Sequence, residues 1–146
     1  MLKLSRAQLE SLERHGEQTY PRECCGVLVG RLEEAGNKLI MRVIACTNTH
    51  TNPTRDYFSI APLELMKIER EADRDGVAIL GFYHSHPDWP ARWSVSDLEE
   101  AHWTGCSYVI TSVLKGKAVE TNSFELQEAE EGKVLIPEDI VSDAVL

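Results

Sequence analysis

Apolar residues follow two different spacings along the chain, and the change between them predicts helices set among strands. Near the N-terminus, apolar side chains recur every three to four residues around a Ser5-x-x-Gln8 capping pattern. The same spacing returns over residues 63–75, directly after Pro62, a residue favoured at a first helical position. Stripes of this kind are typical of helices that bury one face. The N-terminal stripe consists of Leu4, Leu9 and Leu12, with Ala7 beside them.

Short apolar runs bounded by turn residues predict the strands. The predicted strands cover residues 24–32, 38–45, 77–83, 107–114 and 118–126. A polar loop from Cys46 leads into a further short strand before Pro62. A third helix is expected from Ser96 to about Trp103, with Gly105 just after its end. Strands that alternate with helices predict an α/β fold, a single domain with one mixed β-sheet flanked by helices.

Size and charge narrow the class of protein. The chain has 146 residues, enough for one domain with its own core, and 24 acidic against 15 basic residues give it a net charge of −9. This excess of negative charge disfavours nucleic acid and anionic membranes as partners. The sequence has no signal peptide and no apolar run of membrane length, which predicts a cytoplasmic protein.

Four cysteines are present, and none of them forms a Cys-x-x-Cys pair. Adjacent Cys24 and Cys25 would point to opposite faces of a strand, so they could not bind one metal in regular geometry. We therefore interpret the cysteines as small core residues, with a redox or regulatory role for Cys24 or Cys25 as the alternative. The four are Cys24, Cys25, Cys46 and Cys106.

A His-x-His pair stands at the end of the apolar strand that begins near residue 77. Alternation along the strand puts His84 and His86 on one face, with their Cα atoms roughly 6.7 Å apart. Pro87 has no N–H for a sheet ladder and is expected to end the strand. Asp97 follows in the first turn of the third helix, where it would face back toward the strand end.

Two imidazoles and one carboxylate are the ligand set of a catalytic metal site. They leave a fourth tetrahedral position open, unlike a structural zinc site, where the protein fills all four. Zinc fits this set best, and iron(II) uses the same residue types. The structural alternative is a polar strand end beside an acidic residue that stabilises a helix N-terminus.

These residues carry a resemblance to a known family. The run His84-Ser85-His86-Pro87, followed by Ser94-x-x-Asp97, resembles the JAMM signature of the JAB1/MPN/Mov34 metalloprotease family. Residues 21–30 look like the family's early strand with its upstream glutamate, which is Glu23 here. The resemblance implies a sandwich fold similar to that of the cytidine deaminases and one Zn²⁺ per chain, held by His84, His86 and Asp97. It covers residues 1–126 as a metalloprotease domain and leaves 127–146 as a C-terminal edge strand and tail, or a segment that docks on a partner.

Hydrolysis of an amide at such a metal needs a base that is not itself a ligand. In the resembled family, the glutamate that corresponds to Glu23 has this role and returns the proton to the leaving amine. Within the sequence, Glu17, Glu99 and Glu100 are its rivals. Glu17 lies upstream of the matching segment, and the other two are interpreted as solvated charges on the third helix.

Ser94 has two possible roles. It can be the N-cap of the third helix, or, as the resemblance implies, its hydroxyl can donate to the oxyanion of a tetrahedral intermediate. The two roles are compatible only if the Ser94 side chain is not committed to the helix, and Ser96, with Glu99 three residues later, is the alternative cap.

The resemblance also implies a class of substrate. The chain looks like the small prokaryotic members, which cleave adducts or extensions after the Gly-Gly C-terminus of a ubiquitin-like or sulfur-carrier protein. Trp89, Trp93 and Tyr57 are candidate walls for that tail. In the polar loop, His50 is interpreted as a loop residue rather than a ligand, and Arg55 is a weaker candidate for a substrate contact.

Two other functions stay open at this stage. One is a non-catalytic MPN-type scaffold or protein-interaction module, although scaffolds of this kind characteristically lack ligands that this chain has. The other is a hydrolase of a different amide, such as a cell-wall peptide, against which the missing export signal counts. The sequence leaves the oligomeric state open, a homodimer included.

Overall fold

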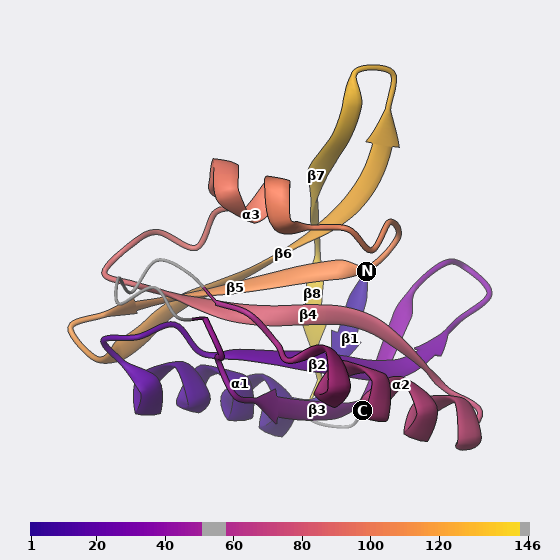
Figure 1. Cartoon of the computed structure of the whole chain (residues 1–146), viewed down its shortest axis with the longest axis horizontal. Coiled ribbons are helices and arrows are strands. Elements are labelled where there is room, and N and C mark those ends of the chain that lie inside the picture. The colour runs from indigo at the N-terminus through magenta and orange to yellow at the C-terminus, as the bar shows by residue number, and fades with distance from the viewer. Residues whose placement is uncertain (51–57, 144–146) are drawn as a thin grey trace.

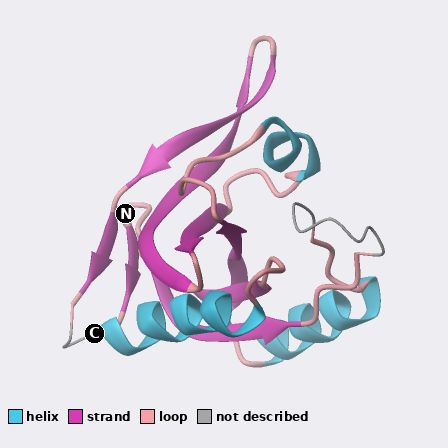
Figure 2. Cartoon of the chain, turned by 90° about the vertical axis from the view of Figure 1, so that its left-hand side faces the viewer, coloured by secondary structure: helices cyan, strands magenta, loops and turns pink. Residues whose placement is uncertain are grey.

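An eight-stranded mixed sheet in the order β7-β6-β5-β4-β2-β3-β1-β8 forms the centre of the protein. The structure is a computed structural model that describes residues 1–50 and 58–143. The helices are α1 (Arg6–Thr19), α2 (Pro62–Arg74) and α3 (Val95–Glu100). The strands are β1 (Leu2–Leu4), β2 (Cys25–Leu32), β3 (Lys38–Cys46), β4 (Ala78–Pro87), β5 (Ser107–Leu114), β6 (Lys117–Ala129), β7 (Gly132–Glu138) and β8 (Ile140–Ser142). The sheet curls strongly, and α1 and α3 lie on opposite sides of its central strands (Figure 1, Figure 2).

Strand β4 lies between β2 and β5, antiparallel to the first and parallel to the second. Every residue of β4 after Ala78 is buried, because helices cover both faces of the sheet. Leu12 of α1 packs in one cluster with Cys24, and Ile68 of α2 packs in another with Cys25. The adjacent cysteines therefore point to opposite faces, as predicted, and the single-domain α/β fold with a mixed sheet is confirmed.

All four cysteines are buried and free of disulfides, which confirms their prediction as core residues. Burial raises the pKa of the Cys24 thiol to about 11, so the thiol is protonated at neutral pH. Because the thiolate is the reactive form, Cys24 has little nucleophilic character in this fold.

The first two helices begin where their capping signals predict. Ser5 caps α1, with its side chain bound to the backbone N–H of Gln8 and the Gln8 side chain bound back to Ser5. Pro62 is the first residue of α2. Leu4, however, does not belong to the helical stripe, because it lies in β1, where the N-terminal residues pair with β3 and β8. A three-residue strand is too short to produce a readable alternation, so the sequence pattern missed it.

Two predictions around the third helix are wrong. Helix α3 ends at Glu100 rather than near Trp103, because Ala101 turns to an extended conformation with φ −77° and ψ 121°. Gly105, with φ +89°, belongs to a separate turn before β5.

The short strand predicted before Pro62 is not found in residues 58–61. Ser59 is instead hydrogen-bonded across the loop to Asn48 and Thr49.

The segment after Leu126 takes part in both edges of the sheet. Strand β6 continues to Ala129, β7 pairs antiparallel with it, and β8 pairs parallel with β1. Strands β7 and β8 are the two ends of the strand order, yet only Asp139 separates them in the chain. The curl thus brings the two edges close enough for one residue to connect them. Within the described residues, no helix combines the length and the apolar character needed to cross a membrane.

A buried charge cluster joins strands that are not neighbours in the sheet. Lys38 on β3 is 2% exposed, and its Nζ contacts Glu125 on β6 at 2.6 Å and Glu138 on β7 at 2.9 Å. The second oxygen of Glu138 accepts hydrogen bonds from the hydroxyls of Ser107 (2.5 Å) and Ser123 (2.8 Å). The sequence pattern assigned Lys38 no role, because a lysine at the start of a strand is usually solvated.

Replacing Lys38 with methionine is expected to lower the free energy of unfolding by about 3 kcal/mol, because the Glu138 carboxylate would stay buried without its cation. Urea unfolding monitored by circular dichroism measures the change. Lys3→Met is the matched control, since it removes the more exposed Lys3–Glu33 pair (2.8 Å) and should cost about 1 kcal/mol or less. Equal losses in the two variants would contradict the role given to the cluster.

Candidate metal centre

The end of β4 presents two buried imidazoles on one face of the sheet. His84 and His86 are 3% and 5% exposed, and their Nε2 atoms lie 3.2 Å apart. Both residues lie in the parallel ladder with β5, opposite Ile110 and Ser112. Because the ladder fixes the backbone on either side of Ser85, the pair projects from a rigid strand as its alternation predicts.

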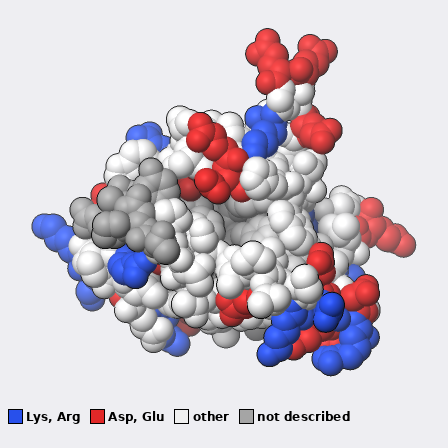
Figure 3. Space-filling model, in the orientation of Figure 1, with Lys and Arg blue, Asp and Glu red and all other residues white. Residues whose placement is uncertain are grey.

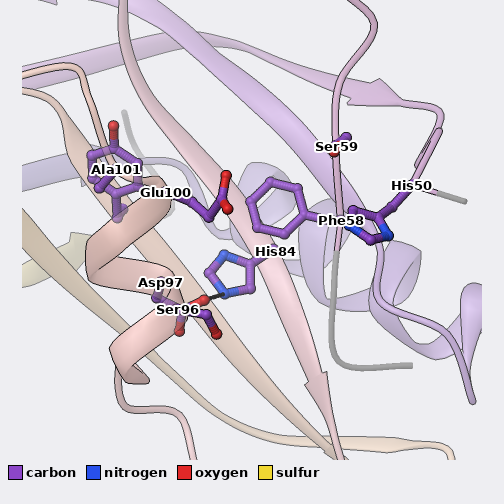
Figure 4. A pocket seen from close by; sticks show the side chains of 9 residues that line it. His50, Phe58, Ser59, His84, Ser96, Asp97, Glu100 and Ala101 are labelled. Carbon is purple, nitrogen blue, oxygen red and sulfur yellow. Dashed lines mark ion pairs between the residues drawn. The ribbon is translucent and has the colours of Figure 1, made fainter. Parts of the chain in front are cut away.

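Asp97 reaches the same point from the first turn of α3. Its two carboxylate oxygens lie 3.1 Å from Nε2 of His84 and 3.0 Å from Nε2 of His86. Burial by itself would raise the pKa of Asp97, but the adjacent imidazoles outweigh it and hold the pKa well below its usual range. Asp97 therefore supplies a carboxylate, the form that binds a cation (Figure 4).

Ser94, not Ser96, caps the helix that carries Asp97. The Ser94 hydroxyl accepts the backbone N–H of Asp97 at 3.1 Å, and the Asp97 carboxylate accepts the N–H of Ser94 at 2.8 Å. Of the two serines that the sequence offers as the cap, the structure uses Ser94, because Asp97 closes a capping box with it. The Ser96 hydroxyl instead lies 3.2 Å from that of Ser94.

Contacts around the two imidazoles orient them for a ligand. His86 Nδ1 lies 3.0 Å from the carbonyl oxygen of Pro90, which can only accept, so Nδ1 carries the proton and Nε2 keeps a lone pair when the ring is neutral. The ring of His84 is stacked on Phe58 with 4.6 Å between centroids. Burial lowers the pKa of His84 despite the opposing effect of Asp97, which favours the neutral ring that a metal binds.

The separations in this cluster fit a zinc ion. Two imidazole nitrogens bound tetrahedrally at 2.0–2.1 Å stand about 3.3 Å from each other. The Nε2 atoms of His84 and His86 are 3.2 Å apart, and a carboxylate oxygen of Asp97 lies within 3.1 Å of each. Over the part of the chain that the structure describes, these three form the one group of His, Cys, Asp and Glu side chains with converging donor atoms.

Glu23 and Ser94 line a pocket that one of the ligands, His86, also lines. Glu23 is 4% exposed and lines a pocket of about 210 Å³ together with His86, Ser94 and Trp89. It precedes β2, in which Cys25 pairs with His84. Two hydrogen bonds extend this register by one residue pair. The backbone N–H of Cys24 donates to Oγ of Ser85 at 2.8 Å, and the backbone N–H of Ser85 donates to the carbonyl oxygen of Cys24 at 3.4 Å. Continued by one more residue, the register puts Glu23 opposite His86.

The remaining sequence candidates are divided between the site and the surface. Trp89 and Trp93 are both exposed, but Trp89 also packs edge-on against His86 with ring centroids 5.8 Å apart. Tyr57 and Arg55 lie outside the described residues. His50 is not part of the ligand cluster, although it does line the neighbouring pocket. Glu17 is engaged elsewhere, since its carboxylate accepts the backbone N–H of Ala118.

The neighbouring pocket contains residues that the sequence pattern did not indicate. It has a volume of about 310 Å³ and is bounded by His84 and Asp97 on one side (Figure 4). Phe58 and Tyr108 form aromatic walls, and Glu100, interpreted from sequence as a solvated charge, lies in its lining. Acidic side chains gather over α3 at the rim of a hollow in this face of the molecule (Figure 3). No local signal singles out Phe58, because it follows a polar loop without a periodic pattern.

Comparisons with known proteins agree with this geometry. The family model of prokaryotic homologs of the JAB domain matches residues 5–127. A probable TtuB-protein conjugate cleaving protease of Thermus thermophilus is 36% identical over 103 residues, which cover 70% of this chain and 65% of that protein. A desampylase of Haloferax volcanii is 33% identical over 92 residues, 63% of each chain. The matched region thus spans just under two thirds of the length of these curated relatives.

A further relative and two solved structures extend the comparison. Tail tip assembly protein K of Escherichia phage N15 is 30% identical over 93 residues, 64% of this chain and 32% of that protein. A solution structure from Desulfitobacterium hafniense has a TM-score of 0.80 and 30% identity, over 98% of this chain and 93% of its own. A JAB1/MPN domain protein from Archaeoglobus fulgidus, at 17% identity, shares the fold with a TM-score of 0.60 over 98% of this chain and 99% of its own.

Proposed function

This chain belongs to the prokaryotic homologs of the JAB domain, and on that premise we propose that it is a zinc-dependent (iso)peptidase. Its substrate would be an amide bond after the Gly-Gly C-terminus of a ubiquitin-like or sulfur-carrier protein. One observation carries the proposal. The donors of His84, His86 and Asp97 converge, and one of these ligands, His86, shares a pocket with the buried carboxylate of Glu23.

Each residue has a separate task in the proposed reaction. His84, His86 and Asp97 hold the ion, which supplies Lewis acidity and makes a water molecule more acidic when bound. Glu23 accepts the proton of the attacking water and gives it to the leaving amine, since it is a buried acidic residue that shares a pocket with His86 and is not a ligand. The burial of Glu23 keeps its carboxylate close to the reacting atoms and away from bulk water.

Ser94 is proposed to stabilise the oxyanion of the tetrahedral intermediate. Its hydroxyl oxygen accepts the N–H of Asp97 as the helix cap, and a hydroxyl that accepts one hydrogen bond still has its own proton to donate. Capping and oxyanion binding are therefore compatible in one side chain. The cap also fixes the position of the hydroxyl, which favours a preorganised donor.

The substrate class is supported by the names of two relatives. One is named for cleaving TtuB-protein conjugates and the other as a desampylase, and they are 36% and 33% identical to this chain over 103 and 92 residues. The pocket beside Glu23 is narrow, about 210 Å³, a size that suits a chain segment without large side chains. A Gly-Gly tail has this property.

The second candidate function is assembly without catalysis. The similarity to a phage tail tip assembly protein favours it, although only 32% of that protein is matched. A scaffold has no need of three converging metal ligands beside a buried glutamate. We therefore keep the peptidase as the leading proposal.

Cleavage of a defined conjugate tests the function. The zinc-loaded protein is expected to release the leaving group from a sulfur-carrier or ubiquitin-like protein conjugated through its terminal Gly-Gly, as resolved by mass spectrometry. Chelation of the metal should abolish the release, and readdition of zinc should restore it. A conjugate joined through a carrier without the terminal Gly-Gly is the matched control. An intact Gly-Gly conjugate in the presence of bound zinc would favour the scaffold function.

A further inference from the structure

Two adjoining pockets on the α3 side of the metal centre have walls that the proposed chemistry does not use. The first is the pocket of about 310 Å³ that opens beside His84 and Asp97. The second has a volume of about 260 Å³ and extends away from the ligands to Trp103. Four residues line both pockets: Phe58, Ser59, Glu100 and Tyr108. The two pockets therefore adjoin along these four residues, the first beside the ligands and the second beyond it.

Glu100 is the charged group on the shared wall. Its carboxylate points across the first pocket toward the ring of Phe58 (Figure 4). Among the described residues it makes no ion pair or side-chain hydrogen bond, whereas the carboxylate of Asp97 is engaged by both histidines. Water solvates the Glu100 carboxylate while the pocket is open. A substrate that covers it removes this water, and a buried carboxylate without a cation is costly.

The other walls favour a particular kind of cation. Phe58, Tyr108 and Trp103 give the pockets aromatic faces, which attract a cation and pack against an aliphatic stem. Lysine and arginine combine such a stem with a terminal charge. We propose that these joined pockets are a subsite for a lysine or arginine side chain next to the scissile bond, with Glu100 as the specificity-determining residue. The proposal rests on the proposed function, because the subsite opens beside the metal centre.

Contacts with other elements hold the backbone at the end of α3, where Glu100 lies. Lys133 on β7 donates to the backbone carbonyls of Glu99 (3.1 Å) and Ala101, the residues on either side of Glu100. The backbone N–H of Trp103 donates to the hydroxyl of Tyr108 at 3.1 Å and ties the following loop to β5. The backbone that carries Glu100 is therefore in place before a substrate binds, which reduces the entropy lost on binding.

Peptide binding tests the subsite separately from catalysis. Each labelled peptide contains one Gly-Gly pair. At several positions around this pair, one residue is varied among lysine, arginine, leucine and glutamate. Fluorescence anisotropy measures the affinity of each peptide for the zinc-loaded Glu23→Gln protein. We expect lysine and arginine to bind about tenfold more tightly than leucine at one position. Adding Glu100→Gln should remove this preference, and Glu100→Lys should shift it to glutamate. Glu99→Gln, an exposed neighbour on α3, is the matched control and should keep it.

The outcomes separate this proposal from the proposed function. Two results overturn the subsite. One is that no position shows a preference for lysine and arginine, and the other is that the Glu100→Gln protein keeps the preference. Cleavage of the same peptides by the wild-type protein is measured alongside. If they are cleaved without a basic preference, the subsite fails and the peptidase stands. If they bind with the preference but are never cleaved, the subsite stands and the peptidase fails.

Discussion

Replacing Glu23 with glutamine is expected to lower kcat by about 10²- to 10⁴-fold while the zinc content stays unchanged. Glutamine keeps the shape of the side chain but cannot accept a proton. Glu23 is 4% exposed and lines the pocket with His86 and Ser94, so a base dissolved in the solvent cannot easily reach its position and accept the proton instead. Single-turnover cleavage of a Gly-Gly conjugate measures the rate, and mass spectrometry of the intact protein measures the metal.

Glu17→Gln is the matched control for this result. Glu17 was a rival for the base on sequence alone, but its carboxylate accepts the backbone N–H of Ala118 at the start of β6. Its substitution should leave kcat unchanged within about twofold, in line with the small effects of most surface substitutions. Full turnover by the Glu23→Gln protein would remove Glu23 from the mechanism.

Removing a ligand is expected to empty the metal site. Wild-type protein should bind about one zinc per chain, and His86→Ala should bind almost none, because two protein ligands hold zinc far more weakly than three. Asp97→Asn should also lose most of the zinc, although the amide oxygen can still accept the N–H of Ser94 and keep α3 capped. Metal content after dialysis at neutral pH, measured by inductively coupled plasma mass spectrometry, gives the result.

His50→Ala is the control for metal content. His50 lines the pocket beside His84 but lies outside the cluster of converging donors, so its loss should leave the zinc content unchanged. Zinc retained at the wild-type level by His86→Ala would show that the cluster is not the metal site. No zinc in the wild type, even after zinc is supplied, would favour the scaffold function instead.

Short-range spacing predicted the parts of the site that lie on regular elements. His84 and His86 could be placed on one face because they are two residues apart on an apolar strand, and Asp97 because a capping signal marks the start of α3. The structure brings these three together. Glu23 could be indicated only through the family resemblance, because a glutamate before a strand is ordinary. Its position opposite His86 depends on the pairing of β2 with β4, which spacing along the chain does not define.

Contacts between distant segments explain what the sequence did not predict. Leu4 was assigned to the helical stripe because its partners in β3 and β8 are far away in the chain. Helix α3 was predicted too long, because no local signal marks the turn at Ala101, and the carbonyl of Glu99 there is bound by Lys133 on another element. Lys38 looked like an ordinary surface lysine, since neither Glu125 nor Glu138 is near it in sequence.

The hydrogen bonds from Lys133 to the end of α3 suggest a way in which related proteins can diverge in sequence. Strand β7 lies beyond residue 127, where the match to the family model ends, yet its Lys133 binds backbone carbonyls at the end of the helix with Asp97 and Glu100. Substitutions in β7 can therefore shift the substrate-facing end of α3 without changing any residue that touches the substrate. Substitutions in β7 could thus adapt the protein to a new conjugate without any change to the metal ligands.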